Sequence, residues 1–161
     1  NESMAISYSN IYGIKTTGLR FFTVYGPWGR PDMALFKFSK SIFKNKPLEV
    51  FNYGNHSRDL TYIDDIVSGI EKSIILKTNY TYEVFNLGNS RSVGLKKILK
   101  LLKNNYKKKI KIKYLTLQKG DIKDTKSDIS KAKKILKYTP KTSPEVGIQK
   151  FCEWFVKYNE I

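Results

Sequence analysis

The feature that most constrains the fold is residues 19–34, where an apolar strand runs directly into a loop rich in glycine, proline and arginine. A helical pattern follows the loop. In open α/β sheets, ligands bind in the crevice beyond the carboxyl ends of the strands. The two prolines of the loop restrict φ, while its two glycines reach backbone shapes closed to other residues. The stretch therefore predicts a rigid substrate wall carrying Thr23, Tyr25 and Arg30.

Helical and strand periodicities alternate along the whole chain, which has 161 residues. This alternation predicts an α/β fold, and no linker divides the chain. We expect strands at 15–22, 48–53, 82–87 and 110–114, and helices at 1–12, 33–44, 95–102, 129–136 and from 61 and 143 onward. Leu19, Phe21 and Phe22 indicate a strand buried on both faces. Residues 54–58 are expected to form a polar turn, and Thr61 with Asp64 to form a capping box. Asp64 and Asp65 are both expected to cap the helix that follows.

The charge of +16 leaves three classes of partner open, namely nucleic acid, an acidic membrane surface and an anionic small substrate. The lysines are spread widely, so a solvated lysine-rich face is the simplest interpretation. No apolar run approaches the length of a membrane span, and we expect no membrane contact. The single cysteine, Cys152, excludes an internal disulfide and favours a reducing compartment, hence the cytoplasm.

Few residues offer catalytic chemistry. The sequence has no glycine-rich dinucleotide loop, and one histidine with one cysteine cannot make a metal site of the usual spacing. Cys152 falls on the apolar stripe of a helix and is expected to be a packing residue, while His56 is expected to be an exposed turn residue. Arg30 and Arg58 remain as candidate anion-binding residues, because a guanidinium matches a carboxylate or a phosphate in a two-point contact. Their alternative interpretation is a pair of surface salt bridges.

Two stretches carry a family resemblance. The first reads Leu-Arg-Phe-Phe-Thr-Val-Tyr-Gly-Pro-Trp-Gly-Arg-Pro-Asp-Met-Ala over residues 19–34, and the second reads Arg-Asp-Leu-Thr-Tyr-Ile-Asp-Asp-Ile over residues 58–66, just after Tyr53-Gly54. Together they resemble the extended short-chain dehydrogenase/reductase nucleotide-sugar epimerases, and most closely the UDP-glucuronate 4-epimerases. The resemblance covers essentially the whole chain. It implies the C-terminal part of such an enzyme, with the edge of the Rossmann sheet plus the small substrate-binding domain.

The resemblance also implies what residues 1–161 lack. In this family NAD takes a hydride from sugar C4, the keto sugar rotates, and the hydride returns to the other face. The base is the tyrosine of a Tyr-x-x-x-Lys pair, which the family places shortly before Asn-Glu, matching Asn1-Glu2 here. We therefore expect no catalytic residue in this chain and an upstream half that binds most of the NAD. The full-length protein is expected to form a homodimer.

Three residues of the matched motifs would contact the sugar and its phosphates. By resemblance, Thr23 would hydrogen-bond the sugar or its carboxylate, and Arg30 would steady the glucuronate carboxylate or the keto sugar. Arg58 would contact the pyrophosphate of the UDP-sugar.

The loop between these positions implies further contacts. Tyr25, Gly26 and Pro27 match the loop that borders the nicotinamide end of the cofactor. Asp32 and Met33 match the turn whose backbone approaches the substrate nucleotide.

The resemblance implies that later segments of the chain contact the uracil base and the ribose of the UDP-sugar. Val50 and Phe51 match the strand against which uracil packs. Asp121 matches a Gln-Pro-Gly-Asp loop that faces the ribose, although Lys119 replaces the usual proline here. Tyr25 and Phe51 fit ligand contact and core packing equally well, whereas Trp28 and Tyr62 are expected to be packing residues.

Two other interpretations stay open. A basic nucleic-acid-binding module would cluster its lysines and arginines on one face and bind with a steep salt dependence. A non-catalytic remnant of a truncated epimerase gene would share the ancestry but lack an upstream half.

Overall fold

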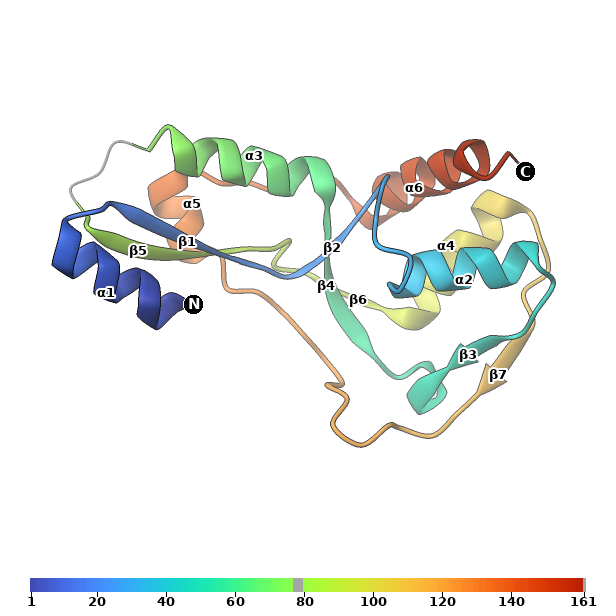
Figure 1. The fold of residues 1–161 in the computed structure, drawn as a ribbon. Coiled ribbons are helices and arrows are strands. Elements are labelled where there is room, and N and C mark those ends of the chain that lie inside the picture. The colour runs from blue at the N-terminus through green and yellow to red at the C-terminus, as the bar shows by residue number, and fades with distance from the viewer. Residues whose placement is uncertain (77–79, 161) are drawn as a thin grey trace.

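The computed structural model describes residues 1–76 and 80–160, which form a mixed α/β structure. Figure 1 shows an elongated molecule with the first helix and the N-terminus at one end and the last helix at the other. The helices are α1 (Glu2–Tyr12), α2 (Ala34–Phe43), α3 (Ile63–Ile74), α4 (Leu95–Tyr106), α5 (Ser130–Leu136) and α6 (Pro144–Tyr158). The strands are β1 (Thr16–Phe21), β2 (Thr23–Tyr25), β3 (Leu48–Val50), β4 (Ser57–Tyr62), β5 (Tyr82–Leu87), β6 (Ser92–Gly94) and β7 (Ile112–Tyr114), and a 3-10 turn, η1, spans Phe51–Gly54.

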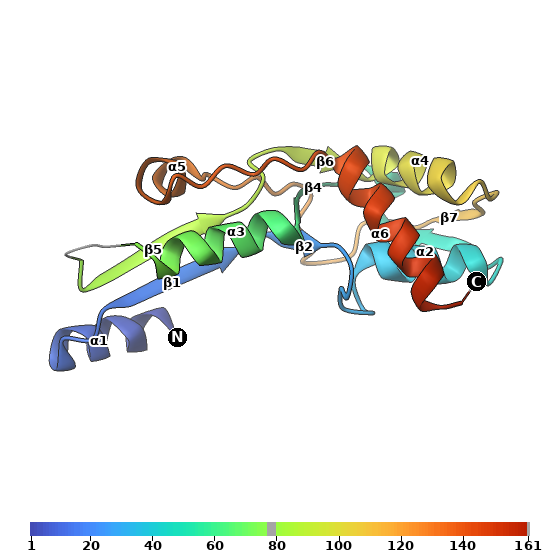
Figure 2. The same ribbon diagram turned by 90° about the horizontal axis from the view of Figure 1, so that it is seen from above.

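The N-terminal end of the molecule is built on the parallel pair β1 and β5, whose register runs from Thr16↔Tyr82 to Phe21↔Leu87. Helices α3 and α5 cover this pair and enclose a small core that includes Phe85, Leu87 and Tyr138. Helix α1 lies on the outer side of the pair (Figure 2).

The chain changes sheets at Phe22. The Phe22 N–H still donates to the carbonyl of Leu87 at 3.1 Å, but β2 pairs in parallel with β4, from Thr23↔Leu60 to Tyr25↔Tyr62. Strand β4 in turn pairs antiparallel with β6. The carboxyl ends of β2 and β4 therefore meet, and the loop after β2 lies against the start of α3.

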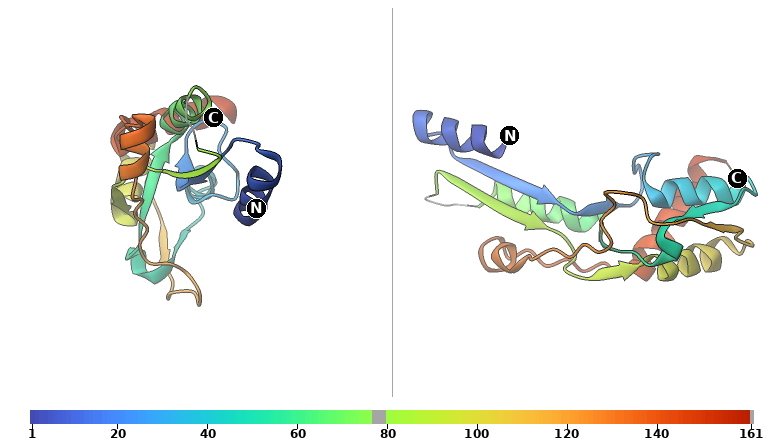
Figure 3. Two further views of the ribbon diagram at one scale, coloured as in Figure 1. Left: turned by 90° about the vertical axis from the view of Figure 1, so that its left-hand side faces the viewer. Right: turned by 90° about the horizontal axis from the view of Figure 1, so that it is seen from below.

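The C-terminal end of the molecule holds a second core between the helices α2, α4 and α6 and the strand β3, which pairs in parallel with the exposed β7 (Figure 3). Aromatic rings fill its centre, and the ring centroids of Phe43 and Tyr106 lie 4.9 Å apart. The buried Tyr106 hydroxyl donates to Ser39 Oγ at 2.8 Å. Cys152 is 3% exposed in this core, which confirms it as a packing residue.

Several expected elements were wrong in detail. Residues 57–62 form β4 rather than a polar turn and a helix start, and the capping box is absent because Thr61 is a fully buried strand residue paired with Val24. Strands β2 and β6 were not predicted, so Thr23 and Tyr25 lie in a strand and not in the loop expected after residue 22. The strand expected at 48–53 ends at Val50. Phe21 is 50% exposed, so the expected burial on both faces of this strand was wrong at Phe21.

Within residues 1–76 and 80–160, none of the helices combines the length and the apolarity that a membrane crossing needs. Over the same residues, histidine, cysteine and carboxylate side chains form no group of three that could hold a metal ion.

Candidate functional site

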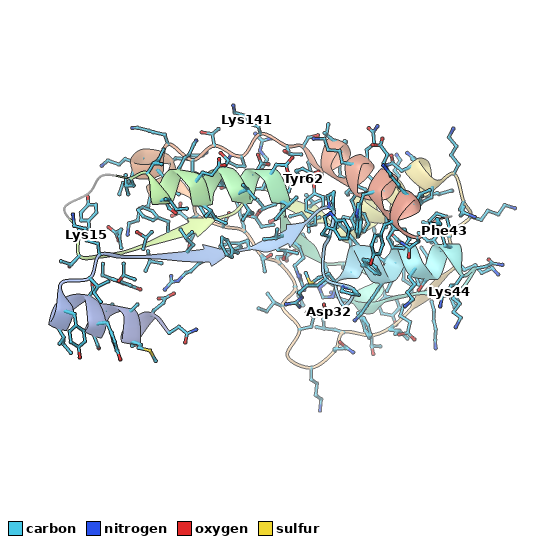
Figure 4. The ribbon with its side chains drawn as sticks, turned by 45° about the horizontal axis from the view of Figure 1, so that its top comes forward. Lys15, Asp32, Phe43, Lys44, Tyr62 and Lys141 are labelled. Carbon is cyan, nitrogen blue, oxygen red and sulfur yellow. The ribbon has the colours of Figure 1, made fainter. Side chains whose placement is uncertain are left out.

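A hollow of about 380 Å³ opens at the carboxyl end of β2. Its lining consists of residues 22–30 together with Met33 and Ile63. The structure thus brings together six of the predicted site residues, namely Thr23, Tyr25, Gly26, Pro27, Arg30 and Met33. Asp32 lies just ahead of α2, and Tyr62 lies at the junction of β4 and α3 (Figure 4); neither lines the hollow.

The shape of the loop depends on Gly26. Its φ is 145°, and a Cβ at this position would lie 2.6 Å from Cγ2 of Ile63. A real Cβ is never that close to another carbon, so the chain can pass beside α3 only with glycine here. The next turn reverses the chain at Trp28, whose φ is 61°. Sequence analysis expected this rigidity from the composition of the loop, but the contact with Ile63 required the structure.

Arg30 points its guanidinium at the neighbouring carboxylate of Asp32. Nε donates to Oδ1 at 3.1 Å and Nη2 donates to Oδ2 at 2.7 Å. The hydrogen bonds from Arg30 hold the pKa of Asp32 below its ordinary value. Both side chains are mostly exposed, so water screens their attraction and the pair contributes little to stability. Arg30 can therefore exchange Asp32 for another anion at small cost.

Trp28 and Tyr25 border the hollow in different ways. Trp28 lies over the end of α6, with its ring centroid 5.7 Å from that of Trp154 and 5.2 Å from that of Tyr158. It nevertheless stays 76% exposed, so the expectation of ordinary packing was only half right.

Tyr25 is 6% exposed, and its hydroxyl faces Gly147, where a Cβ would lie 2.1 Å from the oxygen. Its ring belongs to the core, and burial raises the pKa of its phenol. Tyr62 is 3% exposed, which confirms it as a packing residue.

Arg58 lies inside β4 and not in a loop, which corrects its expected place. Its Nη2 donates to Oδ1 of Asp121 at 3.0 Å, and its Nη1 donates to the carbonyls of Ser57 and Lys123 at 3.0 and 2.9 Å. These bonds tie the loop around Asp121 to the sheet. Arg58 and Asp121 thus lie together, but neither lines the hollow after β2.

His56 is 8% exposed, so its expected exposure was wrong. Its Nδ1 lies 3.3 Å from the carbonyl of Ile122, and its Nε2 lies 3.6 Å from Oδ2 of Asp121, which is too long for a hydrogen bond. The loop that covers His56 lies some 65 residues further along the chain, and nothing in the polar sequence around His56 indicates that loop.

Asp59 is an organising residue that the sequence analysis missed. Its carboxylate is fully buried and accepts from the N–H groups of Asn89, Ser90 and Ser127 at 2.7 to 3.0 Å. It also accepts from Ser127 Oγ at 2.6 Å. Because side chains alternate along a strand, Arg58 and Asp59 point to opposite faces of β4. The only sequence signal was that Asp59 belongs to the second matched motif.

Asp65 performs a similar task at the start of α3. It was expected to cap this helix together with Asp64, but it is 7% exposed and accepts from the N–H groups of Lys141 and Thr142 at 2.9 and 3.0 Å. Figure 4 shows Lys141 beside α3, on the segment that leads to α6. Asp65 therefore holds this crossing segment in place.

The two residues predicted to meet uracil differ sharply. Val50 is fully buried, and its carbonyl accepts from the Leu115 N–H at 2.9 Å. Phe51 is half-buried and lines a separate hollow of about 500 Å³ between α2 and β3. Of the two side chains, only that of Phe51 is accessible from a hollow, while Val50 belongs to the core.

Comparisons with known proteins show which class of proteins shares this loop and this α/β architecture. A sequence model of the NAD dependent epimerase/dehydratase family matches residues 1–88. Since this match covers more than half of the chain, the chain belongs to the NAD dependent epimerase/dehydratase family.

Individual curated proteins of known sequence are similar to almost the whole of this chain. An uncharacterized protein of Methanocaldococcus jannaschii is 52% identical over 157 residues, which are 98% of this chain and 48% of that protein. UDP-glucuronate 4-epimerase of Thermodesulfobacterium geofontis is 41% identical over 95% of this chain and 47% of its own length. The chain thus spans about half the length of these relatives.

Solved structures give the same result. The UDP-glucuronic acid 4-epimerase of Bacillus cereus, in complex with UDP-glucuronic acid and NAD, superposes with a TM-score of 0.91 at 34% identity. The superposition covers 98% of this chain and 50% of that one. A UDP-glucose 4-epimerase of Thermotoga maritima with UDP-glucose gives a TM-score of 0.89 at 30% identity, over 98% of this chain and 51% of its own. The expected fold, part of an extended short-chain dehydrogenase, is confirmed.

Proposed function

We propose that this chain is the UDP-sugar-binding half of an NAD-dependent epimerase that converts UDP-glucuronate to UDP-galacturonate, and that it is not catalytic alone. One observation carries the proposal. The hollow after β2 is lined by the same loop motif that the sequence shares with UDP-glucuronate 4-epimerases. The likeness to a UDP-glucuronate-bound epimerase over 98% of the chain supports the choice of substrate.

In this proposal Thr23 and Arg30 recognise the acidic sugar. The Thr23 hydroxyl offers both a donor and an acceptor to sugar oxygens. Arg30 leaves Asp32 and forms a two-point contact with the sugar carboxylate, for which its planar guanidinium is suited. The exposed position of the Arg30–Asp32 pair favours this exchange.

Arg58 and Asp121 hold the nucleotide in the same proposal. Three of the five guanidinium N–H groups of Arg58 are engaged, with Asp121, Ser57 and Lys123. The two that remain are free to donate to a phosphate oxygen. Asp121 takes the ribose hydroxyls, and Phe51 packs against the uracil ring.

The cofactor meets this chain only along one edge. Tyr25, Gly26 and Pro27 fit that role because all three line the hollow after β2, and Thr23 supplies a polar group beside them. NAD, when bound, supplies reversible hydride acceptance at the sugar. Most of its contacts, the catalytic Tyr-x-x-x-Lys pair and the dimer interface are proposed to lie in an upstream half. A cytoplasmic location stays a prediction.

Calorimetric titration of the purified protein tests the substrate assignment. UDP-glucuronate is compared with UDP-glucose, which lacks the carboxylate, for the wild type and for Arg30→Met. A charge-assisted hydrogen bond is worth about 1.5–3 kcal/mol, so we expect Arg30→Met to weaken UDP-glucuronate by about 10- to 150-fold. Binding of UDP-glucose should change little, and so should both ligands in the control Arg91→Met, whose arginine lies outside the hollow. Equal losses for the two sugars would contradict the role of Arg30.

An activity assay tests the proposal that this chain binds the UDP-sugar but lacks the catalytic groups. The chain alone, with NAD and UDP-glucuronate, should give no UDP-galacturonate by proton NMR. A longer protein that carries the chain after a Tyr-x-x-x-Lys segment should give conversion. Turnover by the chain alone would refute the proposal that it lacks the catalytic groups.

A further inference from the structure

A second and larger hollow, about 730 Å³, lies between α4 and residues 109–114. We call it the basic groove. Its floor is apolar and includes Leu99, Ile110 and Ile112, while four lysines form its walls, namely Lys96, Lys100, Lys103 and Lys109. Figures 1 and 2 show α4 and β7 together at the C-terminal end of the molecule, beyond the loop after β2. The proposed sugar site does not use this groove.

The positive charge of the basic groove is not neutralised. Residues 94–119 contain ten lysines and no acidic residue. In the part of the chain that the structure describes, Lys100, Lys103 and Lys109 have no ion-pair partner, and Lys96 only donates to Oδ1 of Asn55 at 3.0 Å. Lys96, Lys100 and Lys103 follow helical spacing on α4, so they lie along one face of the helix and line the hollow. With Lys109 they make this hollow a local concentration of positive charge.

The outer edge of β7 is unpaired. On its inner side, Lys111 O accepts from the Leu48 N–H at 2.8 Å and the Leu115 N–H donates to Val50 O at 2.9 Å. In a parallel pair alternate residues bond to the neighbouring strand, so the backbone groups of Ile112 and Tyr114 point away from β3. Neither residue has a backbone partner among residues 1–76 and 80–160. Both side chains line the basic groove.

These features together favour one kind of occupant. A free strand edge accepts an extended peptide, and the lysines beside it repel basic strands and attract acidic ones. A bilayer surface is flat and fits a concave groove poorly. Nucleic acid would use the lysines but not the backbone groups of Ile112 and Tyr114. We propose that the basic groove binds an extended acidic segment of a partner protein, which adds a strand to the outer edge of β7.

A fluorescein-labelled peptide of alternating glutamate and valine, seven residues long, is a suitable probe, with an alternating lysine and valine peptide and a labelled oligothymidylate as comparisons. Fluorescence anisotropy with the purified protein measures each Kd. Lys100→Glu/Lys103→Glu reverses charge in the groove. Lys126→Glu/Lys134→Glu makes the same change of net charge at exposed lysines elsewhere. Ile112→Pro removes an outward N–H and leaves the bonds to β3 intact, and Ile112→Ala controls for the lost side chain.

We expect the acidic peptide to bind at least tenfold more tightly than the basic one, with an affinity that falls as salt rises. Lys100→Glu/Lys103→Glu should abolish binding while the control pair weakens it by less than about threefold. Ile112→Pro should raise the Kd of the acidic peptide about tenfold above that of Ile112→Ala and leave oligothymidylate binding unchanged. Thermal melts confirm that each variant is folded. No binding of the acidic peptide, equal binding of oligothymidylate, or no difference between Ile112→Pro and Ile112→Ala would overturn the proposal.

Discussion

Replacing Asp59 by alanine should be among the most destabilising single changes in this chain. The carboxylate is fully buried and accepts four short hydrogen bonds, three from backbone N–H groups and one from the Ser127 hydroxyl, and a longer one of 3.4 Å from the Thr61 hydroxyl. Hydrogen bonds to a charged group contribute about 1.5–3 kcal/mol each, but bonds to one acceptor are not additive. Alanine would leave three backbone N–H groups without their acceptor. An unsatisfied buried donor costs about 1–3 kcal/mol, so we expect a loss of about 3–5 kcal/mol in the free energy of unfolding.

The structure also predicts the behaviour of the isosteric change. Asp59→Asn keeps the shape but turns one acceptor oxygen into an NH₂ group. Both carboxylate oxygens of Asp59 accept from backbone N–H groups, those of Asn89, Ser90 and Ser127. Whichever way the asparagine amide is turned, its NH₂ group therefore faces at least one of these N–H donors. Asp59→Asn should therefore be nearly as unstable as Asp59→Ala. Asp64→Asn is the control, because the Asp64 side chain is 69% exposed and its nearest cation, Lys150, is 4.0 Å away.

Urea unfolding followed by tryptophan fluorescence measures these differences, and thermal unfolding checks them. For a chain of this size about 2–4 °C in Tm accompanies each kcal/mol, so Asp59→Ala should melt roughly 6–20 °C below the wild type. The control should change the free energy of unfolding by less than about 1 kcal/mol. An Asp59→Ala variant within about 1 kcal/mol of the wild type would refute the view that this carboxylate holds the segments together.

Two further changes test the loop and the core. Gly26→Ala should destabilise by more than about 1 kcal/mol beyond Gly13→Ala, since both glycines have positive φ but only Gly26 would bring a Cβ against Ile63; urea unfolding of both variants decides. Burial raises the pKa of Cys152 to about 11. The folded state then binds this proton more tightly than the unfolded state, so stability is full below about pH 9 and falls as pH rises toward 11, by about 2 kcal/mol between pH 8 and 10.5. The stability advantage of the wild type over Cys152→Ala should shrink by that amount, and parallel pH profiles would contradict this reasoning.

Sequence reasoning succeeded where local pattern decides the structure. The apolar spacing of Leu95, Ile98, Leu99 and Leu102 is a local property of one helix, and α4 forms there. The same holds for β5 and for the loop after β2, where a strand, two glycines and two prolines leave few backbone choices. The family resemblance added which part of an extended short-chain dehydrogenase the chain represents, and it suggested the proposed substrate class; no periodicity in the chain contains either.

Sequence reasoning failed where distant segments decide. Residues 57–62 look like a turn followed by a helix start, yet pairing with β2 on one side and β6 on the other makes them a strand. His56 looks like an exposed turn residue, yet the loop near Asp121 covers it. Asp65 looks like a helix cap, yet its carboxylate binds backbone groups of Lys141 and Thr142. In each case the deciding partner is more than thirty residues away in the sequence.

These distant partners bear directly on the proposed site. Arg58, Asp59 and Asp65 all lie on or just after β4, and each binds a segment between residues 121 and 142. That stretch includes the proposed ribose contact and crosses from one core to the other. Arg58 can present its two remaining N–H groups to a phosphate only while Asp121 and Lys123 hold the rest of the guanidinium in place. Loss of the Asp59 carboxylate should therefore weaken nucleotide binding as well as stability, because β4 and the loop that carries Asp121 would no longer be held in register.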